Sequence, residues 1–306
     1  IMLDAVFNHI GDQSPQWQDV LKHGEDSIYK DWFHVQEFPV TKDKLANPRK
    51  LPYHTFAFES YMPKLNTANP QVRDYLLSVA TYWIEEFDID AWRLDVSNEV
   101  DHQFWRDFRK AVLAKKPDLY ILGEVWHTSQ PWLNGDEFHA VMNYPLSDSI
   151  KDYFLRGQKN TSHFIDEINS QSMYYKQQIS EVMFNLLDSH DTERILTTAK
   201  GNIQHVKAAL TFLYLQKGTP CIYYGTELAL IGGPDPDCRR VMPWDRVSDS
   251  NDMLNFMKKL IQLRKDASGI IQHGKYSLEE IKPDVLSLEW NYDGQKVRAI
   301  FNQSKE

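Results

Sequence analysis

The chain has 306 residues, of which 42% are hydrophobic and 25% charged, so it is long enough for one large or two smaller globular domains and is not disordered. Its net charge of −9 argues against a nucleic-acid partner and is compatible with a neutral ligand. No apolar run reaches membrane-spanning length, which argues against a membrane partner. Two cysteines, Cys221 and Cys238, do not make a disulfide framework, so we expect a reducing, cytoplasmic compartment.

Strand-like and helix-like segments alternate about six times along the chain. We expect strands within residues 1–9, 89–96, 119–127, 140–143, 182–191 and 220–225, and helical segments within 70–86, 99–115, 146–155, 163–178, 203–216 and 252–267. This alternation is typical of an α/β fold with a parallel sheet. Because residues 1–7 resemble the middle of a buried strand, we also expect that upstream sequence is missing.

Two regions depart from the alternation. Residues 10–65 are rich in proline and aromatic residues and have no clear periodicity, so we expect an irregular insertion that helps to wall a cleft. Near the end, residues 286–290 and 297–301 flank Asp293-Gly294, which predicts a β-hairpin that opens a further β domain.

Charged residues cluster where the predicted strands end. Arg93 and Asp95 lie two apart on one strand and therefore share a face, and Asn98 follows as an expected helix N-cap. Glu124 ends the next strand, and His190 and Asp191 end a later one. In a (β/α) barrel these ends converge on one face, where catalytic groups lie.

Their surroundings suggest different roles for two of these carboxylates. Asp95, beside Arg93, is expected to stay ionised and to act as a nucleophile. Glu124, beside apolar neighbours, is expected to hold a proton at neutral pH and to act as a general acid. A retaining glycosidase needs this pair of roles.

Six sequence blocks resemble, in order, those of the α-amylase family of glycoside hydrolases. They are residues 4–9 (DAVFNH), 62–66 (MPKLN), 91–99 (AWRLDVSNE), 123–127 (GEVWH), 186–194 (LLDSHDTER) and 218–227 (GTPCIYYGTE). The block at 62–66 resembles the neopullulanase, cyclomaltodextrinase and maltogenic amylase branch. The resemblance implies an incomplete (β/α)8 TIM barrel that starts at the third strand. Residues 1–9 and 66–268 would form strands 3 to 8, 10–65 would be an insertion like domain B, and 269–306 would begin a C-terminal β domain.

The resemblance also implies roles for individual residues. Asp95 would be the nucleophile that forms a β-glucosyl-enzyme intermediate, Glu124 the acid/base, and Asp191 the third carboxylate that holds the sugar 2- and 3-hydroxyls. Arg93 would orient Asp95. The expected substrate-binding residues are His9, Arg93, His190, Asn98, Glu99 and Trp126.

The resemblance further implies the ligands and partners of the protein. Substrates would be malto-oligosaccharides, cyclodextrins or pullulan, cut at α-1,4 and also at α-1,6 glucosidic bonds. No cofactor and no metal site are expected, and the full-length protein is expected to be a homodimer.

Other interpretations stay open. The chain could be an α-glucosidase or oligo-1,6-glucosidase of the same family, an inactive carbohydrate-binding relative, or a fragment that is inactive on its own. A metal-dependent barrel hydrolase ranks last because His9 and His190 come without a third histidine. Read without the family, His9 and His190 would be structural, and Arg239 and Arg240 would only balance Asp235 and Asp237.

Overall fold

The computed structural model describes residues 1–40 and 51–303, so residues 41–50 of the expected insertion and the last three residues lie outside the described part. Within it, the chain forms two compact units. Unit 1 comprises residues 1–125 and 131–141, and unit 2 comprises 126–130 and 142–306. Each unit is described by itself.

Unit 1 is built on a parallel four-stranded sheet in the order β1-β2-β3-β4. Its elements are β1 (Met2–Ala5), α1 (Pro15–His23), α2 (Pro70–Phe87), β2 (Ala91–Leu94), α3 (His102–Lys115), β3 (Tyr120–Gly123) and β4 (Ala140–Val141). Short 3-10 turns lie at Gly24–Asp26, Lys30–Trp32, Phe56–Phe58 and Ser97–Glu99. The predicted strands and the helix over 70–86 are confirmed, whereas the expectation that 10–65 is wholly irregular is wrong, because α1 forms inside it.

The helix boundaries follow from local caps. Asn69 accepts hydrogen bonds from the backbone N–H groups at the start of α2, and Pro70 occupies its first turn. Asp101, and not Asn98, caps α3 by accepting from Gln103 N. The predicted Asn98 cap is therefore wrong: residues 97–99 form a separate 3-10 turn before the helix begins.

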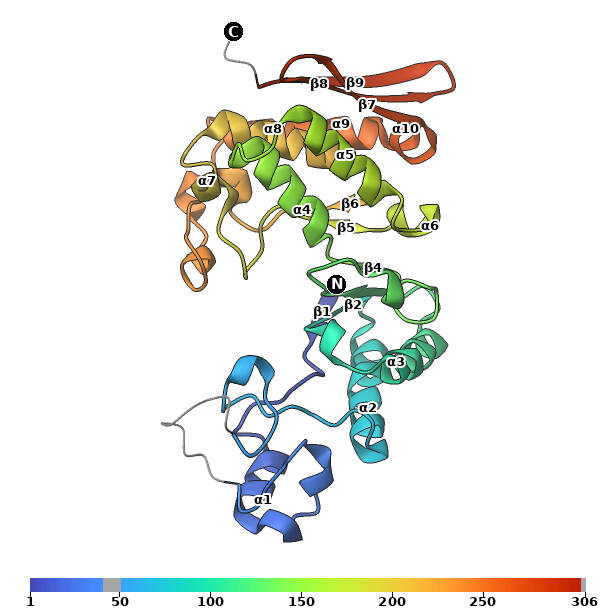
Figure 1. Ribbon diagram of the computed structural model, residues 1–306, viewed down its shortest axis with the longest axis vertical. Helices are drawn as coiled ribbons and strands as arrows, with labels where there is room; N and C mark the ends of the chain where they lie inside the picture. Colours follow the sequence, from blue (N-terminus) through green and yellow to red (C-terminus); the bar gives the residue numbers. More distant parts are fainter. Residues whose placement is uncertain (41–50, 304–306) are drawn as a thin grey trace. The chain divides into compact units, whose positions relative to one another are not determined.

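The helices α2 and α3 lie side by side in unit 1 (Figure 1). Phe7, Phe104 and Phe108 interlock edge to face beneath β1 and β2, and all three are buried. Because this packing covers the sheet, the strands can run through the core with charges only at their carboxyl ends.

Unit 2 combines helices, a short parallel pair of strands and an antiparallel sheet. Its elements are α4 (Tyr144–Ile150), a π-helical turn (Lys151–Leu155), α5 (Thr161–Ser172), α6 (Gln177–Ser180), β5 (Phe184–Asn185), α7 (Ile195–Thr198), α8 (Ile203–Tyr214), β6 (Thr219–Pro220), α9 (Asp252–Asp266), α10 (Ser268–His273), β7 (Lys275–Lys282), β8 (Val285–Tyr292) and β9 (Gln295–Asn302). Strand β5 pairs with β6 in parallel, and β7-β8-β9 form the antiparallel sheet.

The antiparallel sheet shares one hydrophobic core with the helices before it. Phe154, Phe212 and Phe301 pack ring against ring, and the indole N–H of Trp290 donates to Leu215 O at 2.8 Å. The hairpin predicted around Asp293-Gly294 is confirmed as β8-β9, with both turn residues at positive φ. Figure 1 shows this sheet lying over the helices of unit 2.

Candidate active site

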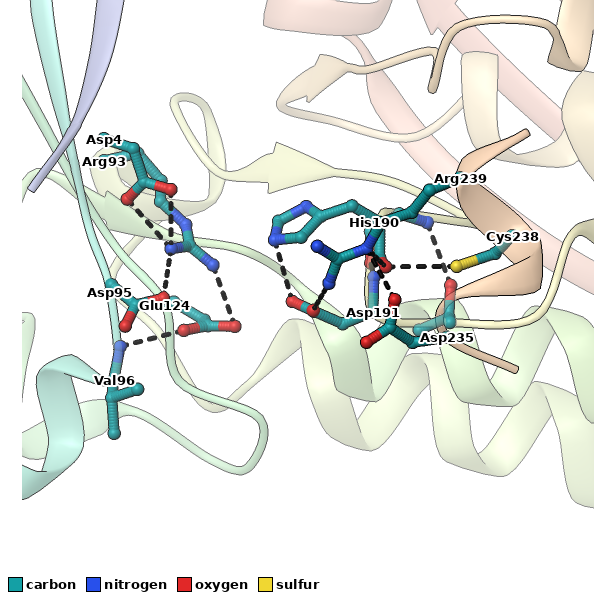
Figure 2. Close-up of polar contacts among 12 residues, drawn as sticks. Asp4, Arg93, Asp95, Val96, Glu124, His190, Asp191, Asp235, Cys238 and Arg239 are labelled. Carbon is teal, nitrogen blue, oxygen red and sulfur yellow. Dashed lines mark hydrogen bonds and ion pairs between the residues drawn. The ribbon is translucent and has the colours of Figure 1, made fainter. Parts of the chain in front are cut away.

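The carboxyl ends of β2 and β3 hold the first cluster of charged groups, centred on Arg93 (Figure 2). The Arg93 guanidinium donates to Asp95 Oδ1 at 2.6 Å and forms an ion pair with Glu124 Oε1 at 2.9 Å. It also donates to both oxygens of Asp4, at 2.9 and 3.1 Å. The predicted same-face pair of Arg93 and Asp95 is therefore confirmed, and Glu124 joins it.

The buried Arg93 guanidinium thus pairs with three carboxylates. Arg93 is 7% exposed and Glu124 is 4% exposed, so both charges depend on each other for stabilisation. Burial by itself would lower the pKa of Arg93, but Glu124, Asp4 and Asp95 together raise it well above its ordinary value. The guanidinium is therefore a fixed positive charge at the floor of this cluster.

Glu124 is buried but not isolated in apolar surroundings. Its Oε2 accepts a hydrogen bond from Val96 N at 2.8 Å, and its Oε1 faces Arg93. The sequence-based argument for a protonated Glu124 relied on its apolar neighbours, and the two contacts are polar. The structure brings a backbone donor and a cation to Glu124 that the sequence did not indicate.

Backbone strain supplies one of these donors. Val96 has φ 45° and ψ 39°, the left-handed region, which a β-branched residue rarely adopts. Such strain costs about 1–3 kcal/mol and collects at functional sites. Here it turns the chain sharply after Asp95 and points the Val96 N–H at Glu124 (Figure 2).

Glu124 is further placed by close packing at Gly123. A Cβ at position 123 would lie 2.5 Å from the ring of Phe138 and 2.9 Å from Ser97 Oγ. The Ser97 hydroxyl donates to Glu124 O at 2.8 Å, and Ser97 O accepts from the Trp105 indole. Only glycine lets β3 end this close to the turn that carries Asp95.

His9, which follows β1, is held by a ring stack. Its imidazole lies parallel to the Phe56 ring with centroids 4.8 Å apart. Burial is the main influence on His9 and lowers its pKa, although the Asp95 charge opposes this effect. His9 is therefore a neutral hydrogen-bonding group close to the predicted nucleophile.

The ammonium group of Lys64 is surrounded by oxygen atoms of Asn8, the neighbour of His9, and of Glu99. Lys64 Nζ donates to Asn8 Oδ1, to Glu99 O at 3.0 Å and to Glu99 Oε2 at 3.4 Å. Burial lowers the pKa of Lys64, and the Glu99 carboxylate partly offsets this. Among the described residues no group of three or more His, Cys, Asp and Glu side chains is arranged to hold a metal ion. These oxygens bind a side-chain cation, the Lys64 ammonium.

Two of the predicted binding residues, Asn98 and Glu99, lie in the 3-10 turn after Asp95. Both are exposed. Glu99 is linked to the insertion through Lys64, whereas Asn98 caps no helix. The structure thus places both at the surface of unit 1, with Glu99 anchored.

Unit 2 holds the second cluster, after β5 (Figure 2). His190 Nε2 lies 3.0 Å from Asp191 Oδ2, and Arg239 donates to Asp191 Oδ1 at 3.1 Å. Arg239 also donates to His190 O at 2.9 Å and pairs with Asp235 at 2.7 Å. The prediction that Arg239 only balances nearby acids is therefore wrong, because it also pairs with Asp191.

Buried polar residues support this second cluster. The single Thr226 hydroxyl donates to the Asp188 carboxylate, with its oxygen 2.9 Å from Oδ2 and 3.1 Å from Oδ1, and burial raises the pKa of Asp188 to about 6. Arg194 is fully buried, donates to Cys238 O at 2.8 Å and lies 3.9 Å over the Tyr223 ring. These contacts tie the loop after β6 to the loop that carries Asp191.

Trp126, the remaining predicted binding residue, is 45% exposed. It stacks on buried Tyr144 with centroids 3.8 Å apart and an interplanar angle of 6°. A fixed, exposed indole face is a good platform for the apolar face of a sugar ring. Trp126 therefore has the exposure that a binding role requires.

Sequence reasoning missed several supporting residues. Lys64 lies in the block at residues 62–66, but the sequence did not indicate that it contacts the site. Phe56 is one of many aromatic residues in the insertion and could not be singled out. The left-handed turn at Val96, which places an N–H donor beside the Glu124 carboxylate, could not be predicted from the sequence, because valine rarely adopts that conformation. Long-range partners such as Arg239 and Asp191 are 48 residues apart and can be paired only by the fold.

Comparison with known proteins agrees with the geometry. The family model for the α-amylase catalytic domain matches residues 1–269. The intracellular maltogenic amylase of Bacillus subtilis (strain 168) is 52% identical over 305 residues, covering 99% of this chain and 50% of the relative. A cyclomaltodextrinase of Geobacillus thermopakistaniensis (strain MAS1) is 49% identical over 308 residues, covering 100% of this chain and 51% of the relative.

The structural comparison gives the same result. A solved cyclomaltodextrinase structure matches with a TM-score of 0.94 and 46% identity, covering 99% of this chain and 52% of that chain. The chain therefore spans about half the length of the curated relatives it matches. With the strand-end carboxylates in place, these matches show that the chain belongs to the α-amylase family of glycoside hydrolases.

Proposed function

We propose that the protein is a retaining α-glucan hydrolase of the neopullulanase and cyclomaltodextrinase type. The observation that carries this proposal is Arg93, whose one guanidinium pairs with both Asp95 and Glu124. Carboxylates bridged by a single guanidinium are close neighbours. Retaining glycosidases keep their two carboxyl groups about 5–5.5 Å apart, whereas inverting enzymes need about 6.5–9.5 Å.

In the first step, Asp95 attacks the anomeric carbon of the sugar. Arg93 holds Oδ1, so the other oxygen forms the new C–O bond while the glycosidic C–O bond breaks. Glu124 gives its proton to the leaving oxygen, and the product of the step is a β-glucosyl ester of Asp95. In the second step Glu124 takes a proton from water, and the resulting hydroxide displaces Asp95 to give an α-configured sugar.

The other residues bind and position the sugar. Asp191 and His190 accept from and donate to hydroxyls of the ring at the cleavage point, with Asp191 held between His190 and Arg239. Neutral His9 donates a hydrogen bond without adding a charge near Asp95. The Trp126 indole supports the leaving-group side. Substrates are malto-oligosaccharides, cyclodextrins and pullulan.

The same proposal extends to fold and partners. The four parallel strands β1 to β4 of unit 1 and the parallel pair β5 and β6 of unit 2 would be strands 3 to 8 of a (β/α)8 barrel. Residues 1–9 and 66–268 would be its barrel part, 10–65 the insertion, and 269–306 the start of a C-terminal β domain. The full-length protein would be a cytoplasmic homodimer without a resident metal. In the described residues, no helix has both the length and the apolar character to cross a bilayer.

The first experiment compares hydrolysis of β-cyclodextrin, pullulan, maltotriose and starch by the full-length protein. We expect cyclodextrin to be opened faster than starch, with α-configured products visible by NMR before mutarotation. Release of glucose only from chain ends would favour the α-glucosidase alternative. β-Configured first products would contradict the retaining mechanism, and a protein that binds but never cuts would be a carbohydrate-binding relative.

A further inference from the structure

A second cavity lies in unit 2, away from the strand ends that carry the candidate site. It has a volume of about 540 Å³ and is lined by α4, α5, the segment after α5, and strands β7 and β8. Met183 and Lys217, which line it, precede β5 and β6, whereas His190 and Asp191 follow β5. The cavity is therefore at the amino ends of these strands, the opposite end from the catalytic groups. Its volume is in the range of small-molecule sites.

Aromatic rings form one part of the cavity wall. Tyr174, Tyr175, Tyr276 and Trp290 all line it. Trp290 is fixed by its hydrogen bond to Leu215 O and by ring contact with Tyr276 at 4.7 Å. Tyr174 is 39% exposed at the mouth of the cavity. Rigid rings of this kind suit a ligand with flat apolar faces.

Carboxamide side chains form the polar part of the cavity wall, and some of their donors are already used. The amide nitrogen of Gln171 donates to Pro145 O and Ser149 Oγ, that of Gln177 to Glu181, and that of Gln216 to Phe212 O. Gln177 and Gln216 each use one of their two amide N–H groups, so they can offer a ligand the second N–H as well as the carbonyl oxygen. The cavity therefore suits a ligand whose polar groups both donate and accept hydrogen bonds, as hydroxyl groups do.

The charges of the lining residues indicate the net charge of the ligand. Among the described residues that line the cavity there is no Asp or Glu, and the single cation there, Lys217, pairs with Glu181 at 3.7 Å and lies over the Trp290 ring. A phosphate or carboxylate ligand would call for uncompensated Arg or Lys, and a cationic ligand would call for a carboxylate. Neither is present in the lining, so the fitting ligand is neutral.

The hydroxyl of Tyr276, a residue that lines the cavity, is buried and poorly paired. Tyr276 Oη is inaccessible to solvent and has no hydrogen bond of good geometry within the described residues, although the Gln216 amide lies near enough to influence it. An unpaired buried hydroxyl costs free energy, which a ligand hydroxyl would recover.

From these features we infer that the cavity is a non-catalytic binding site for a neutral hydroxyl-rich sugar of one or two glucosyl units. Aromatic faces cover the C–H faces of the ring, while the amide groups and Tyr276 bind its hydroxyls. The choice of maltose as the sugar rests on the proposed function, because an α-glucan hydrolase produces it.

The test is calorimetric titration of maltose into the full-length protein carrying Glu124→Gln, which stops turnover. We expect two classes of site. In that background, Tyr276→Phe should weaken one class about fivefold, as expected for one lost hydrogen bond. Tyr174→Ala should weaken the same class about tenfold. Tyr82→Ala, which removes an exposed tyrosine of α2 outside the cavity, should change neither class.

The outcomes separate this inference from the proposed function. A single class of site that responds only to Asp191→Asn would overturn the second site and leave the hydrolase proposal intact. A class that responds to Tyr276→Phe in a protein that hydrolyses no α-glucan would support the second site and overturn the hydrolase. Two classes of site whose maltose affinities are both unchanged by Tyr276→Phe and by Tyr174→Ala would also overturn the inference.

Discussion

Arg93 is the group whose removal should disturb this protein most, and Arg93→Leu tests that expectation. The variant leaves Glu124 buried, with a side chain 5% exposed, and without its cation. Removing one partner of a buried ion pair costs about 3–5 kcal/mol. Because the Asp4 and Asp95 side chains are 51% and 21% exposed and can be solvated, we expect the low end, about 3 kcal/mol of the free energy of unfolding.

A double-mutant cycle with Glu124→Gln isolates the Glu124 contribution. Since glutamine carries no charge, Arg93→Leu should cost about 2 kcal/mol less in the Glu124→Gln background than in the wild type. Asp4→Asn is the matched control: its exposed pair should contribute about 1 kcal/mol or less.

The assay is urea unfolding of the four proteins of the cycle and the control, followed by circular dichroism at constant pH. A cost below about 1 kcal/mol for Arg93→Leu would refute the reasoning that Glu124 depends on this cation. Strict additivity of the two substitutions would refute it as well. Loss of hydrolysis without any loss of stability would mean that Arg93 acts on substrate alone.

Three further predictions concern packing, pH and the bound ammonium. Gly123→Ala should cost about 1–3 kcal/mol of stability through collision with the Phe138 ring and should reduce hydrolysis by displacing Glu124. Gly11→Ala, whose added Cβ would meet no described atom within 4 Å, should melt like the wild type. Equal melting of both variants would contradict the packing argument. The pKa of Asp188 is raised to about 6 in the folded state, against 3.8 for an ordinary Asp side chain, so the folded state binds the extra proton. The free energy of unfolding should therefore fall by about 1 kcal/mol from pH 5 to 7.5, and Asp188→Asn should remove this slope in urea titrations. An unchanged slope in Asp188→Asn would assign it to other groups. Lys64→Met should cost about 1.5–3 kcal/mol of the free energy of unfolding, because it leaves the oxygen acceptors of Lys64 unpaired. A chelator should not alter hydrolysis by the wild type. Inhibition by the chelator would contradict a site that is filled by the Lys64 ammonium.

Much of the fold could be predicted because local patterns and tertiary packing agree. The apolar spacing of 70–86 and its Asn-Pro start predicted α2 to within a residue, since capping and burial act on the same segment. The strand that ends in Arg93 and Asp95 was predicted for the same reason. The helix inside the insertion was missed because its apolar face is short, with Trp17 and Val20 as its buried residues. The Asn98 cap was wrong because a left-handed turn at Val96 delays the helix to His102.

The sequence by itself determined the family, the order of strands and helices, and the residue types at the strand ends. These properties depend on local spacing and on short blocks of residues, so they survive without coordinates. Only the tertiary structure decided what each charged group contacts. It placed Asp4 and Glu124 on one guanidinium, Lys64 on the oxygens of Glu99, and Arg239 on Asp191. Such partners lie 31 to 89 residues apart along the chain or on different strands, and no local pattern encodes a contact that exists only once the backbone has brought the two segments together.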